Sequence, residues 1–120
     1  MKILVAHASN YDYQTELYEP LKQSALAKEH TLIFPHDAEN VEIETSSHIP
    51  DAGLMIAEVS YPSTGAGIEI GLAQAANVPT LFMHKTGTTP SFALKFITGK
   101  VIEYKDSADL VSKIESELRA

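Results

Sequence analysis

Cysteine is missing from this chain of 120 residues. Its absence argues against a secreted disulfide scaffold and excludes both thiol catalysis and zinc bound by cysteine. Basic residues are also scarce, since 9 Lys and Arg stand against 16 Asp and Glu and give a formal net charge of -7. Without a basic patch to compensate phosphates, nucleic-acid binding is not expected.

Long apolar runs are missing as well. No stretch approaches the length of a membrane-spanning helix, and residues 1–7 are too short an apolar segment, without a cleavage pattern, to be a signal peptide. We therefore expect a soluble cytoplasmic protein that does not bind membranes. The length and the 44% hydrophobic content predict a single globular domain over residues 1–120.

Strand and helix patterns alternate along the chain. Apolar runs predict five strands, at residues 2–6, 31–35, 53–60, 79–84 and 101–104. Helical patterns occupy residues 14–28, 64–77, 90–98 and 107–118. Pro20, inside the first helical pattern, predicts a helix start nearby or a kink. The alternation predicts an α/β fold in which helices cover both faces of a parallel sheet.

Ligands of such sheets bind at the carboxyl ends of the strands, near the point where the strand order reverses. The loops expected there are residues 7–13, 35–39, 58–67 and 84–90. They carry aromatic and imidazole side chains suited to a flat ring, namely His7, Tyr11, Tyr13, His36, Tyr61 and His84. Each one alone can be ordinary loop polarity, but together they favour a ligand site at this edge.

The segment 57–71 carries the strongest chemical signal. A strand breaks into a loop rich in Pro, Ser, Thr and Gly, and a helix follows. This order brings backbone N–H groups and the positive end of a helix dipole to one point. Ser63 or Thr64 is the expected N-cap.

Two carboxylates flank this loop. Glu69, in the second turn of the helix, is expected to point back toward the loop, where Gly67 and Gly71 permit a close approach. It either attacks an electrophilic carbon or stabilises a cation, or loop N–H groups simply satisfy it. Glu58 is a second inward candidate, or a residue that holds the loop in shape.

These residues resemble the signature of the nucleoside 2-deoxyribosyltransferase superfamily, in the form Ala57-Glu58-Val59-Ser60-x-Pro62-Ser63-x-Gly65-x-Gly67-x-Glu69-x-Gly71. The likeness is greatest to its 2'-deoxynucleoside 5'-phosphate N-hydrolase branch. It implies a flavodoxin-like three-layer sandwich with a five-stranded parallel sheet. It also implies hydrolysis or transfer at the N-glycosidic bond of a (deoxy)nucleoside or nucleotide. We expect no cofactor and no metal.

The resemblance assigns roles residue by residue. Glu69 matches the family nucleophile, which attacks the anomeric carbon and forms a covalent glycosyl-enzyme. Ser63 and Gly65 match the loop that receives sugar or phosphate, and His36 matches a histidine after the second strand. The residues expected to bind the substrate are His7, Tyr11, His36, Ser63, Gly65 and Gly67.

The chain departs from the family pattern at three places. Residues 7–12 contain neither the Gly nor the Arg with which the hydrolase branch grips a 5'-phosphate. The position of a family Asp that helps to place the sugar falls near Thr45. Ser91 lies near the position of a Ser that crosses to the neighbouring subunit. Spacing does not choose among the substitutes for the missing acid, which are Asp12, Asp37 and Glu39.

Other functions remain open at this stage. The main alternative is a non-catalytic module that kept the nucleoside or nucleotide pocket and lost the chemistry. The phosphoribohydrolase type shares the Gly loop before a helical Glu but needs a paired Gly and Thr that the chain lacks. A flavin protein would need a Ser/Thr-rich loop after the first strand, and a receiver protein an Asp in place of Glu58.

A homodimer or larger homo-oligomer is expected as well. The resemblance implies pockets completed across a subunit boundary. Phe92 and Phe96 place an apolar stripe on a predicted outer helix, and such a stripe usually meets a partner. Alternatively, the two rings cap the core of their own chain.

Overall fold

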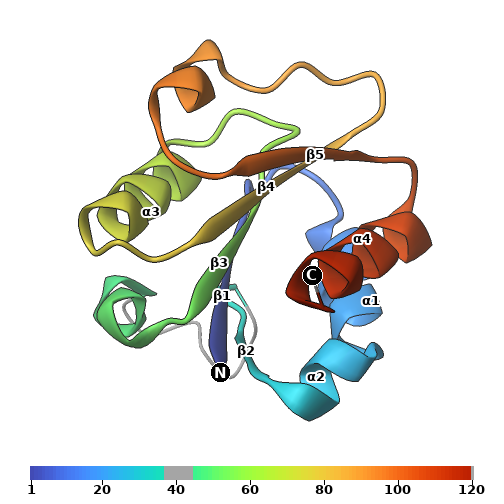
Figure 1. The fold of residues 1–120 in the computed structure, drawn as a ribbon. Coiled ribbons are helices and arrows are strands. Elements are labelled where there is room, and N and C mark those ends of the chain that lie inside the picture. Colours follow the sequence, from blue (N-terminus) through green and yellow to red (C-terminus); the bar gives the residue numbers. More distant parts are fainter. Residues whose placement is uncertain (37–44, 120) are drawn as a thin grey trace.

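A computed structural model describes residues 1–36 and 45–119. Its centre is a sheet of five parallel strands in the order β2-β1-β3-β4-β5 (Figure 1). The strands are β1 (Lys2–Ala6), β2 (Thr31–Ile33), β3 (Leu54–Glu58), β4 (Thr80–Lys85) and β5 (Lys100–Tyr104). All five predicted strands are present, so the predicted parallel sheet is confirmed.

Helical segments cover both faces of the sheet, as Figure 1 shows. One face carries the π-helical turn η1 (Gln14–Tyr18), α1 (Glu19–Lys22), α2 (Ala25–Glu29) and α4 (Ser107–Arg119). The other face carries η2 (Thr45–Asp51) and η3 (Phe92–Phe96), both 3₁₀-helical, and α3 (Thr64–Ala75). These three layers confirm the flavodoxin-like sandwich. No helix in the described ranges is both long and apolar enough to cross a membrane.

Two apolar clusters hold the layers together, one on each face of the sheet. Side chains of a strand alternate between faces, so Ile3 and Val5 pack toward α1 and α4 while Leu4 packs toward α3. Burial on both faces explains why the strands appear in the sequence as continuous apolar runs.

The first crossover differs from the single helix predicted over residues 14–28. The Glu19 N–H donates to the Gln14 carbonyl, five residues back, and Pro20 has no N–H to continue the ladder. A second break follows at Ser24, which is extended and donates its hydroxyl to the Leu21 carbonyl at 2.6 Å. The prediction of one continuous helix over residues 14–28 was therefore wrong, whereas the predicted helix start near Pro20 is confirmed.

The crossover between β4 and β5 is reduced to the single turn η3. The Gln74 side chain of α3 secures it, because Nε2 donates to the Thr98 carbonyl at 2.6 Å and Oε1 accepts from the Thr98 N–H at 3.0 Å. The Gln74 side chain thus pairs with both backbone groups of Thr98, as a residue of a neighbouring strand would.

The strand order reverses between β1 and β3. From β1 the chain moves outward to β2, returns to β3, and then continues outward on the other side. A reversal of this kind opens a crevice at the carboxyl ends of the two strands. The fold thereby directs attention to the residues that follow Ala6 and Glu58.

Candidate functional site

Five rings meet where β1 ends, and we call them the ring cluster: His7, Tyr11, Tyr13, Tyr18 and His36. The centroid of His7 lies 4.6 Å from Tyr13, 5.0 Å from Tyr18, 5.1 Å from His36 and 6.4 Å from Tyr11. The members come from the loop after β1, from η1 and from the residues after β2. The fold has therefore brought His7, Tyr11 and His36 together, as the sequence predicted.

Hydrogen bonds fix the tautomer of His7 at the centre of the ring cluster. Its Nδ1 lies 2.6 Å from the Ala8 carbonyl, which can only accept, so Nδ1 carries the proton. Nε2 then accepts from the Tyr18 hydroxyl at 2.5 Å, and that hydroxyl accepts from the His36 N–H at 3.0 Å. Burial, with a smaller effect of His36, lowers the pKa of His7 to about 4, although the Ala8 carbonyl acts to raise it. The imidazole is thus neutral at pH 7.

This neutral histidine predicts a loss of stability in acid. Its pKa is about 4 in the folded chain against 6.5 ordinarily, so the unfolded chain binds more protons between these values and acid favours unfolding. From this group alone, the free energy of unfolding is expected to fall by about 2 kcal/mol between pH 7 and pH 4.5. Urea titrations of the protein and of His7→Gln at both pH values measure it. An equal loss in both proteins would contradict the prediction.

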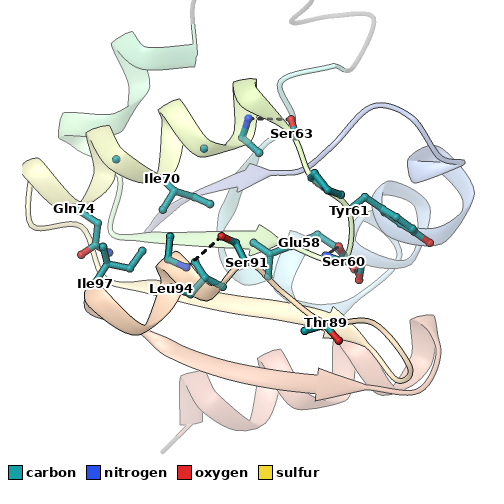
Figure 2. Close-up of a pocket in the computed structure, with 16 residues that line it drawn as sticks. Glu58, Ser60, Tyr61, Ser63, Ile70, Gln74, Thr89, Ser91, Leu94 and Ile97 are labelled. Atoms are coloured by element: carbon teal, nitrogen blue, oxygen red, sulfur yellow. Dashed lines mark hydrogen bonds between the residues drawn. The ribbon is translucent and has the colours of Figure 1, made fainter.

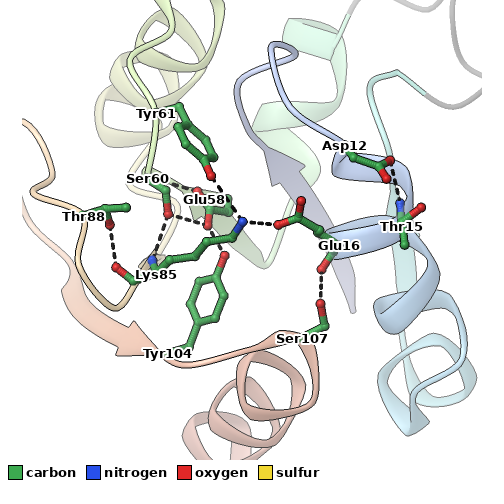
Figure 3. A network of polar contacts seen from close by, with 10 residues as sticks. All are labelled: Asp12, Thr15, Glu16, Glu58, Ser60, Tyr61, Lys85, Thr88, Tyr104 and Ser107. Carbon is green, nitrogen blue, oxygen red and sulfur yellow. Dashed lines mark hydrogen bonds and ion pairs between the residues drawn. The ribbon is translucent and has the colours of Figure 1, made fainter.

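Glu58, the last residue of β3, has its carboxylate filled by hydrogen bonds (Figure 3). Oε1 accepts from the Ser60 N–H at 2.7 Å, and Oε2 accepts from the Ser60 hydroxyl at 2.8 Å and from the Tyr104 hydroxyl. Burial and the bond to Glu58 raise the pKa of Tyr104, so its hydroxyl stays a donor. These contacts favour the interpretation that Glu58 holds the loop in shape.

Lys85, the last residue of β4, reaches into the space beside this network, where Figure 3 shows it between Glu16 and Tyr61. Its Nζ forms an ion pair with Glu16 of η1 and lies 3.2 Å from the Tyr61 hydroxyl. The same atom lies 5.4 Å from the centroid of Tyr11 and 5.5 Å from that of Tyr61. Burial acts to lower the pKa of Lys85, but hydrogen bonds to Glu16 and Tyr61 outweigh it and raise the pKa. The ammonium group is therefore charged.

The helix α3 starts from the loop that Glu58 holds. Ser63 is the N-cap, and its Oγ accepts from the Ala66 N–H at 3.2 Å. Glu69 follows in the second turn, half-buried, with Oε2 out of contact with solvent. At 100° per residue, Glu69 lies about 160° around the helix from both Gly67 and Gly71. These glycines and Glu69 thus occupy opposite flanks of α3.

One of these flanks borders a cavity of about 850 Å³ between α3 and η3 (Figure 2). The walls are mostly apolar, with Ile70, Leu94 and Ile97 facing one another. Ser63 and Gly67 line it, whereas Glu69 does not. In Figure 1, α3 lies between η3 and η2, and it packs against η2 on the side away from the cavity.

The expected substrate-binding residues are therefore divided between the ring cluster, the cavity and the first turn of α3. His7, Tyr11 and His36 belong to the ring cluster, while Ser63 and Gly67 belong to the cavity. Gly65 is exposed in the first turn of α3. The roles of these residues and of Glu69 stay predictions.

The substitutes for the family Asp are placed only in part. Asp12 is exposed, and its Oδ1 accepts from the Thr15 N–H at 3.3 Å at the start of η1. Asp37 and Glu39 lie outside the described residues. In the part of the chain that the structure describes, no three His, Asp or Glu side chains gather closely enough to hold a metal ion.

Phe92 and Phe96 do not cap the core. They are 64% and 76% exposed, and their ring centroids lie 5.3 Å apart. Ile68 and Leu72 of α3 are exposed as well. The apolar stripe on which the expected homodimer is based is thus present, and the homodimer itself stays a prediction.

No family model matches the chain. A sequence relative is the protein named "Putative 2'-deoxynucleoside 5'-phosphate N-hydrolase 1" of Syntrophotalea carbinolica, which is 40% identical over 65 residues. The match covers 52% of this chain and 46% of that protein, so the chain spans about half the length of its relative.

A solved structure, that of the Clostridium botulinum CMP N-glycosidase BcmB, matches with a TM-score of 0.75 at 15% identity. The match covers 98% of this chain and 99% of that one, and at such low identity it concerns the fold. The sequence similarity confirms the resemblance to the 2'-deoxynucleoside 5'-phosphate N-hydrolase branch over about half of the chain, and the structural similarity shows a shared fold.

Proposed function

We propose that this protein cleaves the N-glycosidic bond of a nucleoside or nucleotide, with Glu69 as the nucleophile. The observation that carries the proposal is the setting of Glu69. Its carboxylate stands in the second turn of a Ser-capped helix behind the carboxyl edge of the sheet, with one oxygen buried. A partly desolvated carboxylate is suited to attack on an electrophilic carbon.

The reaction follows from the nucleophile. A Glu69 oxygen bonds to the anomeric carbon while the bond from that carbon to the base nitrogen breaks, and the base keeps the electron pair and takes a proton from solvent. Water then attacks the anomeric carbon of the glycosyl-enzyme. Its hydroxyl stays on the sugar, its other proton passes to solvent, and the carboxylate is restored. An acceptor base in place of water would make the same step a transfer.

The partly exposed rings of the ring cluster, Tyr11, Tyr13 and His36, support a substrate that contains a planar base. Tyrosine and imidazole rings offer broad apolar faces with polar edges, which suits the recognition of flat heterocycles. The fixed tautomer of His7 presents a neutral ring at the centre of the cluster. The names of the two relatives, an N-hydrolase of deoxynucleoside phosphates and a CMP N-glycosidase, support the same class of substrate.

Incubation with matched sets of deoxyribonucleosides, ribonucleosides and their 5'-monophosphates tests the proposal. Chromatography should detect a free base that appears only with the protein, and reactions with a second base reveal transfer. A compound that binds without releasing its base would instead support the non-catalytic binding module. Neither binding nor release across the panel would contradict both functions.

A further inference from the structure

Lys85 stands out among the sequence segments that follow the strand ends. The segments that follow the first four strands are residues 7–13, 34–44, 59–63 and 85–91, and Lys85 is the single Lys or Arg among them. An anionic ligand in this crevice therefore has one full positive charge within these segments to bind.

The backbone of Lys85 is anchored, while its side chain is partly exposed. The Lys85 N–H donates to the Ser60 hydroxyl at 2.8 Å, and Glu58 holds Ser60 in turn. The side chain as a whole retains 26% exposure. The ammonium group is thus held among Glu16, Tyr61 and Tyr11, on a side chain that is still partly exposed.

A carboxylate already occupies one side of this ammonium group. Glu16 pairs with Lys85, and the backbone carbonyl of Glu16 accepts from the Ser107 hydroxyl at 2.7 Å, which steadies η1. An ion pair this exposed is weak, so another anion can compete with Glu16 for Lys85.

Tyr11, whose ring lies under the Lys85 ammonium group, carries a further donor. Lys85 Nζ lies over its ring, and its hydroxyl oxygen is buried without a hydrogen-bond partner among the described residues. Burial and the nearby Glu58 and Glu16 raise the pKa of Tyr11, so the phenol keeps its proton. A buried donor of this kind gains from an incoming acceptor.

We infer that Lys85 is the specificity residue that binds the phosphate group of a nucleoside monophosphate. When the phosphate binds, Lys85 exchanges its ion pair with Glu16 for one with the phosphate. The inference deepens the proposed function and rests on it. It also accounts for the loop of residues 7–12, which carries no Arg. A charge-assisted hydrogen bond from Lys85 would supply the cationic contact to the phosphate that this loop does not provide.

The test compares the binding of 2'-deoxynucleosides with that of their 5'-monophosphates, by calorimetric titration in a Glu69→Gln background that prevents turnover. Lys85→Met is expected to weaken binding of the monophosphate by roughly 10- to 100-fold and to leave the nucleoside unchanged. Lys85→Arg should restore most of the loss. Glu16→Gln should tighten the monophosphate by roughly two- to five-fold.

Lys95→Met is the matched control, because Lys95 lies over the ring of Phe92 on η3, away from this network. It should change neither affinity. A Lys85→Met variant that loses both ligands equally, or neither, would overturn the inference, as would a protein that binds no monophosphate at all. Monophosphate binding that depends on Lys85, with no base released by the unmodified protein, would keep the inference and reject the N-glycosidase.

Discussion

Replacement of Glu69 with glutamine is expected to reduce base release by roughly 10³-fold or more. The amide keeps the size of the side chain but cannot form the glycosyl ester. Because Glu69 is half-buried on the flank of α3 and is not part of either apolar cluster, the fold should persist. Initial rates of base release for both proteins measure the effect.

Glu103→Gln is the control for the change in charge, since Glu103 is exposed on the edge strand β5. It should release base at the original rate. Intact-mass spectra after rapid quenching should show a glycosyl adduct on the unmodified protein and none on the Glu69 variant. Base release by the Glu69 variant at the original rate would mean that Glu69 is not the nucleophile.

The parallel sheet could be predicted from the sequence because its causes are local. Strands buried on both faces leave continuous apolar runs, and the lengths between them fit crossovers of a parallel sheet. The first crossover was harder to predict. The apolar spacing of Leu17 and Leu21 suits one continuous helix, and the sequence does not reveal the π-helical turn that precedes the helix start near Pro20.

The part of the candidate site that comes from loops directly after strand ends could be predicted. His7, Tyr11 and His36 follow strand ends, so the topology alone brings them together. Pairs between distant segments were missed, because no local pattern links their members. Lys85 and Glu16 are 69 positions apart, and Tyr104 and Glu58 are 46 apart. The charge of Lys85 next to a strand end was the available signal for the first pair.

Replacement of Gly99 is expected to reduce the stability of the fold strongly. Gly99 joins η3 to β5 at a φ of +149°, a value that other residues rarely adopt. A Cβ at this position would lie 2.3 Å from Phe82 Cε2 and 2.8 Å from the Thr80 carbonyl oxygen. Phe82 is fully buried and Thr80 belongs to β4, which is paired on both sides, so neither can retreat without loss.

Gly99→Ala is therefore expected to lower the free energy of unfolding by about 3 kcal/mol or more, and the midpoint of thermal unfolding by roughly 10 °C. Gly87→Ala separates the two causes, because Gly87 has a φ of +87° but nothing within 4 Å of its Cβ position. Backbone strain alone should cost that variant about 1 kcal/mol. If calorimetry gave equal losses for both variants, the close approach of β5 to Phe82 would not be what requires glycine at this position.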